Sequence, residues 1–322
     1  MKLRLLKEAE IIHFVRKEFF SKEKGLALGI GDDAAVIRAG TKSLILTKDL
    51  LIENVHFKKS FHPPRMLGRK SLAVNVSDIA AMGAKSRFAL LGLGLPKNTP
   101  PGFVESFFEG FKAAAENFST VLIGGDVCRA EKVTISVTVI GEGRKIVTRS
   151  GARPGHIIYV SGHLGNAAEG LAILKKGVRW GEDRERDVLL KAFLDPDPCL
   201  KLGAALAKGP LVSSMIDLSD GLSADLDHIC RESGCGAEIE KECIPLSSCL
   251  KKFSRRPYDR ALYGGEDYQL LFTVPPEKVP AVEKIGRGYC LTRIGRIIRR
   301  RDIFIIENKK RRPLIKRSFE HF

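Results

Sequence analysis

The chain alternates short apolar segments of strand length with longer segments of helical periodicity, and this alternation limits the folds open to it. Residues 43–52 are apolar over the length of a strand, and residues 133–142 place apolar side chains at every second position. The segment between them has one apolar stripe at helical spacing, formed by Phe103, Phe107, Phe111 and Ala114. The pattern predicts an α/β protein, in which helices pack on sheets.

The pattern breaks once and then starts again. Residues 149–156 interrupt it with glycine, proline and charge, and residues 157–174 resume it as a strand, a glycine turn and a helix. A further strand at 211–217 precedes a helix at 222–233. A chain of 322 residues is long enough for two cores. We therefore predict two α/β domains, residues 1–147 and residues 148–322.

The formal net charge of +16 allows two interpretations. The basic segments 296–301 and 309–317 would suit a nucleic-acid-binding protein. However, no aromatic residues interleave with the basic ones, and no helix-turn-helix pattern accompanies them. The abundance of Lys, Arg and Glu beside a single glutamine instead resembles the charged surfaces of heat-adapted proteins. We therefore expect no nucleic-acid partner.

The chain also lacks the marks of a membrane or secreted protein. Its most apolar short window, FALLGLGLP, is too short to span a bilayer, and charges interrupt the N-terminal segment. Seven cysteines without a disulfide framework indicate a reducing compartment. We expect a cytoplasmic protein with no membrane partner.

Acidic residues gather at the predicted junctions between elements, while the phosphate loop GxxxxGK[ST] is absent. Each follows a glycine or lies near a strand end: Asp32, Asp33, Asp49, Asp126, Asp217, Asp220, Glu266 and Asp267. In the helix expected over 65–84, Ser71, Asn75 and Asp78 share the face opposite the apolar one. We interpret this polar face as lining a site, although it could also be solvated.

Each acid also has a simpler explanation. Asp220 could cap a helix, Asp126 could belong to a turn, and the pair Asp32–Asp33 could form a solvated turn. The glycine turn at 162–165 could cradle a phosphate or be an ordinary tight connection. Together, the carboxylates supply the oxygen ligands that Mg²⁺ prefers when it also holds substrate phosphates. The set therefore predicts metal-assisted phosphate chemistry.

Six segments resemble the thiamine-monophosphate kinase family, in its order and spacing. They are LGIGDDAAVI (28–37), LTKDLLIENVHF (46–57), AVNVSDIAAMGA (73–84), LIGGDVCRA (122–130), IDLSDGLSADL (216–226) and LYGGEDYQLLFTV (262–274). The family belongs to an ATP-binding superfamily with aminoimidazole ribonucleotide synthetase. The resemblance implies that superfamily's two-domain α/β fold, with an N-terminal domain that pairs across a homodimer and a C-terminal domain that closes the nucleotide cleft. It also implies ATP-dependent phosphorylation of thiamine monophosphate to thiamine diphosphate.

The resemblance implies roles for single residues as well. The Mg²⁺ ligands would be Asp33, Thr47, Lys48, Asp49, Asp78, Asp126, Asp217 and Asp220, with Lys48 acting partly through its backbone oxygen. The catalytic set would be Asp33, Asp126, Asp220 and Arg149. ATP would be bound by Gly125, Asp126, Arg149 and Ser219, and thiamine monophosphate by His56, Glu266 and Phe319.

Three positions depart from the family pattern: Lys48 replaces Thr or Ser, Val127 replaces Thr, and Cys199 replaces Arg. A side-chain metal ligand at Lys48 is therefore in question, and the segment around Cys199 is assigned no substrate role. Two alternatives remain at this point: another ATP-dependent, ligase-like member of the same superfamily, or a basic nucleic-acid-binding protein.

Overall fold

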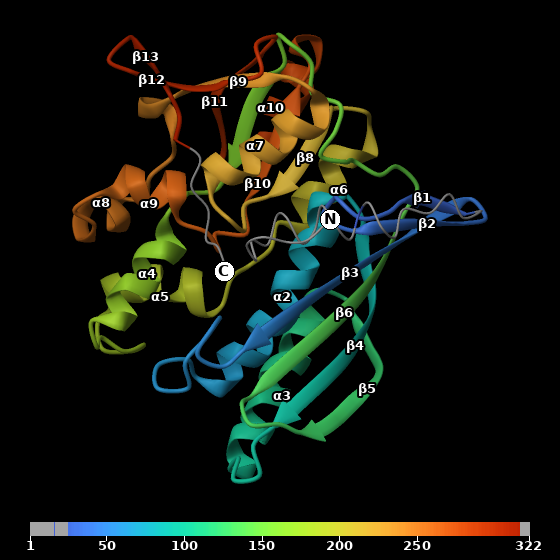
Figure 1. Cartoon of the computed structure of the whole chain (residues 1–322), viewed down its shortest axis with the longest axis vertical. Coiled ribbons are helices and arrows are strands. Elements are labelled where there is room, and N and C mark those ends of the chain that lie inside the picture. The colour runs from blue at the N-terminus through green and yellow to red at the C-terminus, as the bar shows by residue number, and fades with distance from the viewer. Residues whose placement is uncertain (1–15, 17–24, 316–322) are drawn as a thin grey trace, which may run out of the picture.

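The computed structural model describes residue 16 and residues 25–315, which form two halves with one sheet each (Figure 1). The described elements of the first half are β1 (Leu26–Leu28), β2 (Ala35–Ala39), β3 (Lys42–Ile52), α2 (Pro64–Ala81), β4 (Lys85–Leu95), α3 (Pro101–Asn117), β5 (Val121–Arg129) and β6 (Thr134–Gly143). The strand predictions for 43–52 and 133–142 are confirmed, and so is the helix with the phenylalanine stripe.

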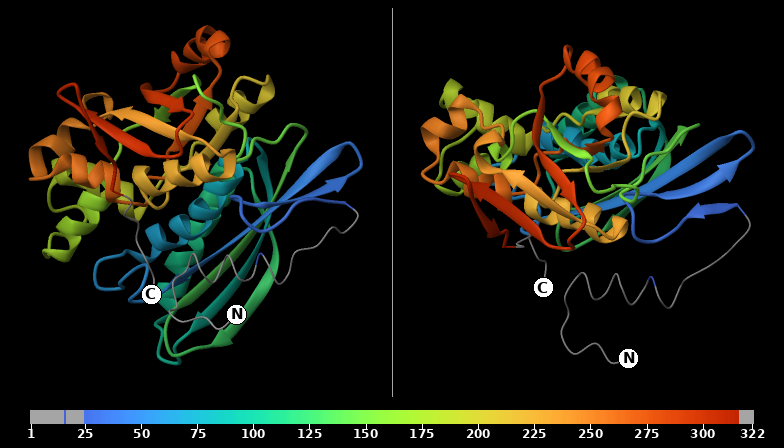
Figure 2. Two further views of the ribbon diagram at one scale, coloured as in Figure 1. Left: turned by 45° about the horizontal axis from the view of Figure 1, so that its top comes forward. Right: turned by 90° about the horizontal axis from the view of Figure 1, so that it is seen from above.

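The first sheet has the strand order β1-β2-β3-β6-β4-β5. All neighbours are antiparallel except β4 and β5, which run parallel because α3 connects them. Helices α2 and α3 pack on one face of this sheet, and they approach closely because Gly68 and Gly110 lack side chains (Figure 2). A Cβ on Gly110 would lie 1.8 Å from the backbone oxygen of Arg65.

The second half contains a sheet of order β13-β12-β9-β11-β7-β10-β8. Its strands are β7 (Ile157–Ser161), β8 (Ser214–Asp217), β9 (Gly236–Glu240), β10 (Leu270–Val274), β11 (Leu291–Ile298), β12 (Ile303–Glu307) and β13 (Lys310–Pro313). Its helices are α4 (Asn166–Lys175), α5 (Arg184–Leu194), α6 (Leu200–Lys208), α7 (Leu222–Ser233), α8 (Ser248–Phe253), α9 (Pro257–Tyr263) and α10 (Val279–Gly286), with short 3₁₀ turns η1 (Lys241–Cys243) and η2 (Pro276–Lys278).

Helix α2 lies between the two halves. One side packs on β3, β4 and β6 of the first sheet, and another side contacts α5, α6 and β8 of the second half (Figure 1). Both faces of the helix are therefore buried, including Ser71 and Asn75 on the face that the sequence marks as polar. A polar stripe that is buried at such a junction is available to build a site.

The α/β class and the two-sheet arrangement agree with the prediction from sequence. The boundary between residues 147 and 148 stays a prediction. Of the helices in the described part of the chain, none is both long and apolar enough to cross a bilayer.

Candidate active site

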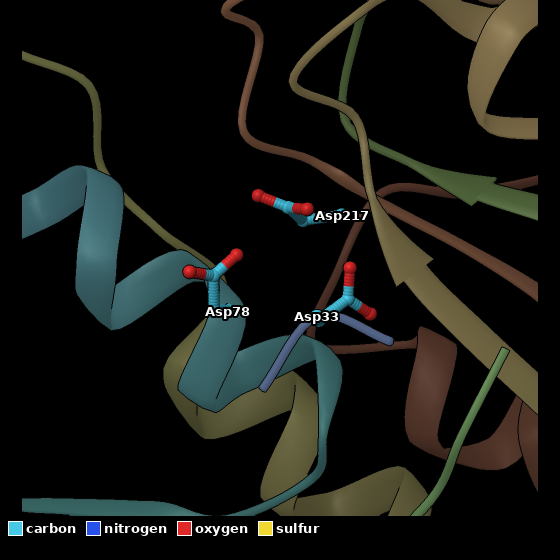
Figure 3. Close-up of side chains that lie close together, drawn as sticks. All are labelled: Asp33, Asp78 and Asp217. Carbon is cyan, nitrogen blue, oxygen red and sulfur yellow. The ribbon is translucent and has the colours of Figure 1, made fainter. Parts of the chain in front are cut away.

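Three carboxylates converge where the two halves meet (Figure 3). Asp33 lies in the connection between β1 and β2, Asp78 lies on α2, and Asp217 is the last residue of β8. One oxygen from each lies within 4.8 Å of the others. Segments far apart in sequence thus bring three acids to one point.

Neighbouring side chains hold these three carboxylates in place. The Thr47 hydroxyl donates a short hydrogen bond to Asp78. The Ser77 hydroxyl donates to Asp217 Oδ2 at 2.6 Å. Because Thr47 belongs to β3 and Ser77 to α2, the sheet and the helix of the first half both contribute to the orientation of the cluster.

Asp49 and Asp220 extend the acidic site. Asn75 Oδ1 accepts a hydrogen bond from the Asp49 backbone N–H at 3.0 Å, so the polar stripe of α2 contacts β3 here. Burial raises the pKa of Asp49, and the negative charge of Asp220 raises it further. The N-cap position of α7 is Gly221 and not Asp220, and the N–H groups of both residues donate to Oδ2 of the buried Asp225.

Burial is the main cause that raises the pKa of these acids. It raises the pKa of Asp33, Asp49 and Asp217 to about 6 in each case. It raises the pKa of Asp78 well above its usual value, and the neighbouring carboxylates add to that rise. The site thus holds its negative charges at a cost, which a bound cation would relieve.

The donor set fits a hard divalent cation. All of the gathered acids offer carboxylate oxygens, the ligand type that Mg²⁺ prefers. Asp33 Oδ2 is also buried without a hydrogen-bond partner among the described residues. A buried, unpartnered carboxylate oxygen is costly unless something binds it. The interpretation of Asp32 and Asp33 as a solvated turn is therefore wrong for Asp33, whose side chain is fully buried.

Arg149 supplies the positive charge that the paired aspartates need. Its Nε and Nη2 donate to Asp33 Oδ1 at 3.0 and 2.5 Å, and its backbone N–H donates to Asp32. Although burial works against the charged form, Asp33 raises the pKa of Arg149 further above its ordinary value. The guanidinium predicted to meet ATP phosphates thus lies beside the carboxylate cluster.

The two described residues that were predicted to bind thiamine monophosphate lie in different halves. His56 lies in the turn after β3, where its Nδ1 accepts a hydrogen bond from the Ile52 N–H at 3.0 Å. Glu266 lies in the loop between α9 and β10, and its Oε2 accepts a hydrogen bond from Lys70 at 2.7 Å. Sequence reasoning missed Lys70, although a lysine within the apolar helix sequence was a signal. The predicted Phe319 lies outside the described residues.

Two predicted ligands have side chains that do not lie at the cluster within one chain. Asp126 is exposed and lies within β5, so the turn interpretation is wrong. It pairs with Gly92 of β4, and β6 then separates β4 from β3. Three strand spacings amount to roughly 14 Å between β5 and β3. The exposed Lys48 side chain alternates with Thr47 and Asp49, so it points to the opposite face of the sheet.

Packing requires one glycine of the segment GGD (residues 124–126). A Cβ on Gly125 would lie 1.9 Å from the backbone oxygen of Leu91 on β4. Close strand approach therefore explains Gly125 without a ligand. Its predicted contact with the nucleotide, like that of Ser219, stays a prediction.

The glycine turn at 162–165 is not available to a phosphate. Asp267 Oδ2 accepts a hydrogen bond from the Gly165 N–H at 2.5 Å, and Asp267 Oδ1 accepts one from the Ala167 N–H at 3.1 Å. These groups form the N-terminus of α4, where a phosphate would otherwise bind. The turn is a structural connection that an internal carboxylate already fills.

The basic C-terminal segments are partly neutralised by internal acids. Arg296 and Arg311 both pair with Glu238, and Arg300 pairs with Asp302. Three of the side chains that prompted the nucleic-acid alternative, on β11, on β13 and in the connection between β11 and β12, are thus engaged in ion pairs.

Two family descriptions together match most of the chain. "AIR synthase related protein, N-terminal domain" matches residues 31–142, and "AIR synthase related protein, C-terminal domain" matches residues 153–308. The matched ranges correspond to the two halves with their separate sheets.

Three named relatives are similar over most of their length. The thiamine-monophosphate kinase of Aquifex aeolicus is 37% identical over 327 residues, covering 100% of both chains. That of Escherichia coli K12 is 39% identical, covering 79% of this chain and 78% of the relative. That of Bacillus subtilis is 33% identical, covering 98% and 99%.

Two solved structures also match this chain. The structure of AaThiL complexed with AMPPCP and TMP matches with a TM-score of 0.89 at 35% identity, covering 100% of this chain and 99% of that one. A HypE–HypF complex matches with a TM-score of 0.76 at 16% identity, which indicates a shared fold only.

Proposed function

The chain belongs to the thiamine-monophosphate kinase family, and on this premise we propose that it transfers the γ-phosphoryl group of ATP to thiamine monophosphate, forming thiamine diphosphate. The observation that carries the proposal is the cluster of Asp33, Asp78 and Asp217 between the two halves, in which Asp33 and Asp217 are buried and Asp78 is half-buried. The relative AaThiL, solved with AMPPCP and TMP, supports ATP and thiamine monophosphate as the two substrates.

We propose that Asp33, Asp78 and Asp217 hold Mg²⁺, with Asp49 and Asp220 beside them. The unpartnered Asp33 Oδ2 and the exclusively oxygen donors support this assignment. Bound Mg²⁺ would supply positive charge between the phosphate groups of the two substrates. Thr47 and Ser77 orient the carboxylates, so the ligand oxygens are placed before any ligand arrives.

The reaction that we propose is a direct, in-line transfer. The acceptor is a phosphate oxygen whose second pKa is about 6, so it is largely ionised at neutral pH and needs no general base. Phosphoryl transfer then depends chiefly on positioning and electrostatics. Arg149 would contact the ATP phosphates, because its guanidinium already lies at the carboxylate cluster. Ser219 and Gly125 would touch the nucleotide.

Thiamine monophosphate would bind beside the cluster, against His56 and Glu266. His56 Nδ1 accepts a hydrogen bond from the Ile52 N–H, which fixes the orientation of the ring. Phe319 is proposed to lie against the thiamine rings, on the strength of the family resemblance alone.

We also propose that the protein is a homodimer that pairs through the open face and the β5 edge of the first sheet. All nine residues of β5 are exposed, including Val121 at 57%, Ile123 at 53% and Val127 at 65%. Contiguous exposed apolar surface of this kind marks an interface, and an unpaired edge strand needs cover. A second copy of the chain would cover both the apolar surface and the unpaired edge of β5.

The dimer would also explain Asp126. Because β5 lies about three strand spacings from β3 within one chain, Asp126 and Asp49 cannot bind one metal ion in the same subunit. We propose that the Asp126 carboxylate serves the site of the opposite subunit. Lys48, on the face opposite Asp49, would contribute only its backbone oxygen.

A substrate screen tests the function against the related ligase-like enzymes. The protein would be incubated with ATP and Mg²⁺ and with either thiamine monophosphate or an aminoimidazole precursor. We expect ADP release only with thiamine monophosphate, matched by an equal amount of thiamine diphosphate. ADP release with the aminoimidazole precursor alone would favour the ligase-like alternative.

A further inference from the structure

Lys70 is a buried cation that connects α2 to the loop carrying Glu266. Its side chain is only 1% exposed. Its Nζ donates to Glu266 Oε2 at 2.7 Å and to the backbone oxygen of Phe193 at 2.9 Å, and it lies 3.8 Å from the centroid of the Phe193 ring. The ammonium group thus joins the first half of the chain to two segments of the second.

Stability alone does not account for this arrangement. Replacing a buried ion pair by apolar side chains of similar volume is often neutral or stabilising, because both ions lose their hydration. The neighbouring Arg69 already joins α2 to the second half through Asp195 at 2.7 Å, and the Arg69 side chain is more exposed than that of Lys70. A second connection that buries its cation therefore suggests a task at Glu266 itself.

The backbone of Glu266 is held from several directions. Its φ of 67° is in the left-handed region, which is unfavourable for a residue with a side chain. Its N–H donates to the Ser219 oxygen at 2.8 Å, and the next residue, Asp267, is fixed to the N-terminus of α4. The backbone of Glu266 is therefore fixed, and the hydrogen bond from Lys70 fixes the torsions of its side chain.

The same face of α2 also orients the carboxylate cluster. Lys70 and Ser77 are seven residues apart, which places them on one face of the helix. Lys70 contacts Glu266, and Ser77 contacts Asp217. Along the helix the two contacts are roughly 10 Å apart. Helix α2 thus fixes the spacing between a predicted metal ligand and a predicted substrate contact.

We propose that Lys70 is a positioning residue that fixes the direction of the Glu266 carboxylate toward a cationic acceptor substrate. The inference rests on the proposed function, since the thiazolium ring of thiamine monophosphate is a permanent cation. The Glu266 side chain is 27% exposed, so it is accessible to such a ligand, whereas Lys70 is not. Without Lys70, binding would have to order a long, freely rotating side chain, which weakens affinity.

The test uses Lys70→Met, which keeps the length of the side chain and removes its charge, in the full-length enzyme. We expect the KM for thiamine monophosphate to rise about tenfold, with the KM for ATP changed less than about twofold. Arg69→Met is the matched control, because it removes an adjacent connection between the halves that does not contact Glu266. This control should leave the KM for thiamine monophosphate within about twofold of wild type.

The double variant Lys70→Met/Glu266→Gln separates positioning from a general structural effect. It should have the same KM for thiamine monophosphate as Glu266→Gln alone, because Lys70 acts through Glu266. This comparison still decides the matter if Lys70→Met alone fails to fold, since the double variant removes both charges together. An unchanged KM in Lys70→Met, or a further rise in the double variant, would overturn the proposal.

Calorimetric titration of the same variants with thiamine monophosphate, without ATP, separates this proposal from the proposed function. Binding that weakens about tenfold in Lys70→Met supports the positioning role even if the wild-type protein shows no turnover. If wild type turns over but Lys70→Met binds thiamine monophosphate normally, the positioning role fails and the kinase assignment stands. No binding to wild type would remove the basis of both.

Discussion

Arg149 and Asp33 form a two-point contact in which the guanidinium donates twice to one carboxylate oxygen, at 3.0 and 2.5 Å. The other oxygen, Asp33 Oδ2, is buried without a hydrogen-bond partner among the described residues. The protein therefore satisfies one oxygen of Asp33, and one oxygen of this carboxylate lies within 4.8 Å of oxygens of Asp78 and Asp217. This asymmetry is what a residue needs if it must hold a metal ion on one side and stay anchored on the other.

Magnesium should stabilise the wild-type protein through this cluster, and Asp78→Asn should remove the effect. Asn can still accept the hydrogen bond from Thr47, while the repulsion among buried acids decreases. We expect the melting temperature of metal-free Asp78→Asn to equal or exceed that of wild type. Addition of millimolar Mg²⁺ should raise the melting temperature of wild type only. A variant stabilised by Mg²⁺ as much as wild type would exclude Asp78 from the metal site.

The raised pKa values predict an unusual pH dependence of stability. Burial raises the folded-state pKa of Asp49 from 3.8 to about 6, so the folded protein holds a proton that the unfolded chain has already lost. The contribution of Asp49 to the free energy of unfolding should therefore fall as pH rises from about 4 to 6. Urea unfolding of metal-free wild type and Asp49→Asn across this range isolates the contribution. A difference between the two proteins that does not change with pH would contradict it.

Subunit mixing tests whether Asp126 serves the opposite subunit. If the active site combines Asp49 of one chain with Asp126 of its partner, a heterodimer of Asp49→Asn and Asp126→Asn subunits keeps one intact site. Random exchange of two inactive homodimers should then restore about one quarter of wild-type turnover. Absence of any recovery after verified exchange would place both residues in one subunit's site or outside it.

Asp267 should be a stability residue. It accepts backbone hydrogen bonds at the N-terminus of α4, which has no side-chain cap of its own at Gly165. Asp267→Ala should lower the free energy of unfolding by about 2 kcal/mol, the upper range for a helix cap. Chemical denaturation measures this directly, and Asp267→Asn, which retains an acceptor oxygen, should lose less. Equal stability of wild type and Asp267→Ala would show that the cap contributes nothing.

The sequence predicted elements best where one periodicity dominates. The helix at 222–233 matches α7, and Phe107 and Phe111 are buried as their spacing required. It also predicted that Asp78 faces a site, because the polar stripe of α2 contrasts with the charged surfaces of this chain. Such predictions rest on local patterns that the tertiary structure preserves.

Local sequence patterns could not predict the contacts between segments that are distant in the chain. The pairing of Lys70 with Glu266 depends on how α2 packs against the second half, and no local signal encodes that partner. Asp126 resembled a turn residue because it follows two glycines, but Gly125 is needed for close packing on β4. In the same way, Asp267 fills the glycine turn that could have cradled a phosphate.

The most direct test of the central claim follows the labelled phosphoryl group itself. The protein is incubated with Mg²⁺, γ-labelled ATP and either thiamine monophosphate or free thiamine. We predict label in thiamine diphosphate, none in any product of free thiamine, and none on the protein after denaturation. The reason is that an ionised phosphate oxygen of the acceptor attacks the γ-phosphorus in line, without a base, and ADP leaves. Label in thiamine monophosphate formed from thiamine, or label retained on the denatured protein, would contradict it.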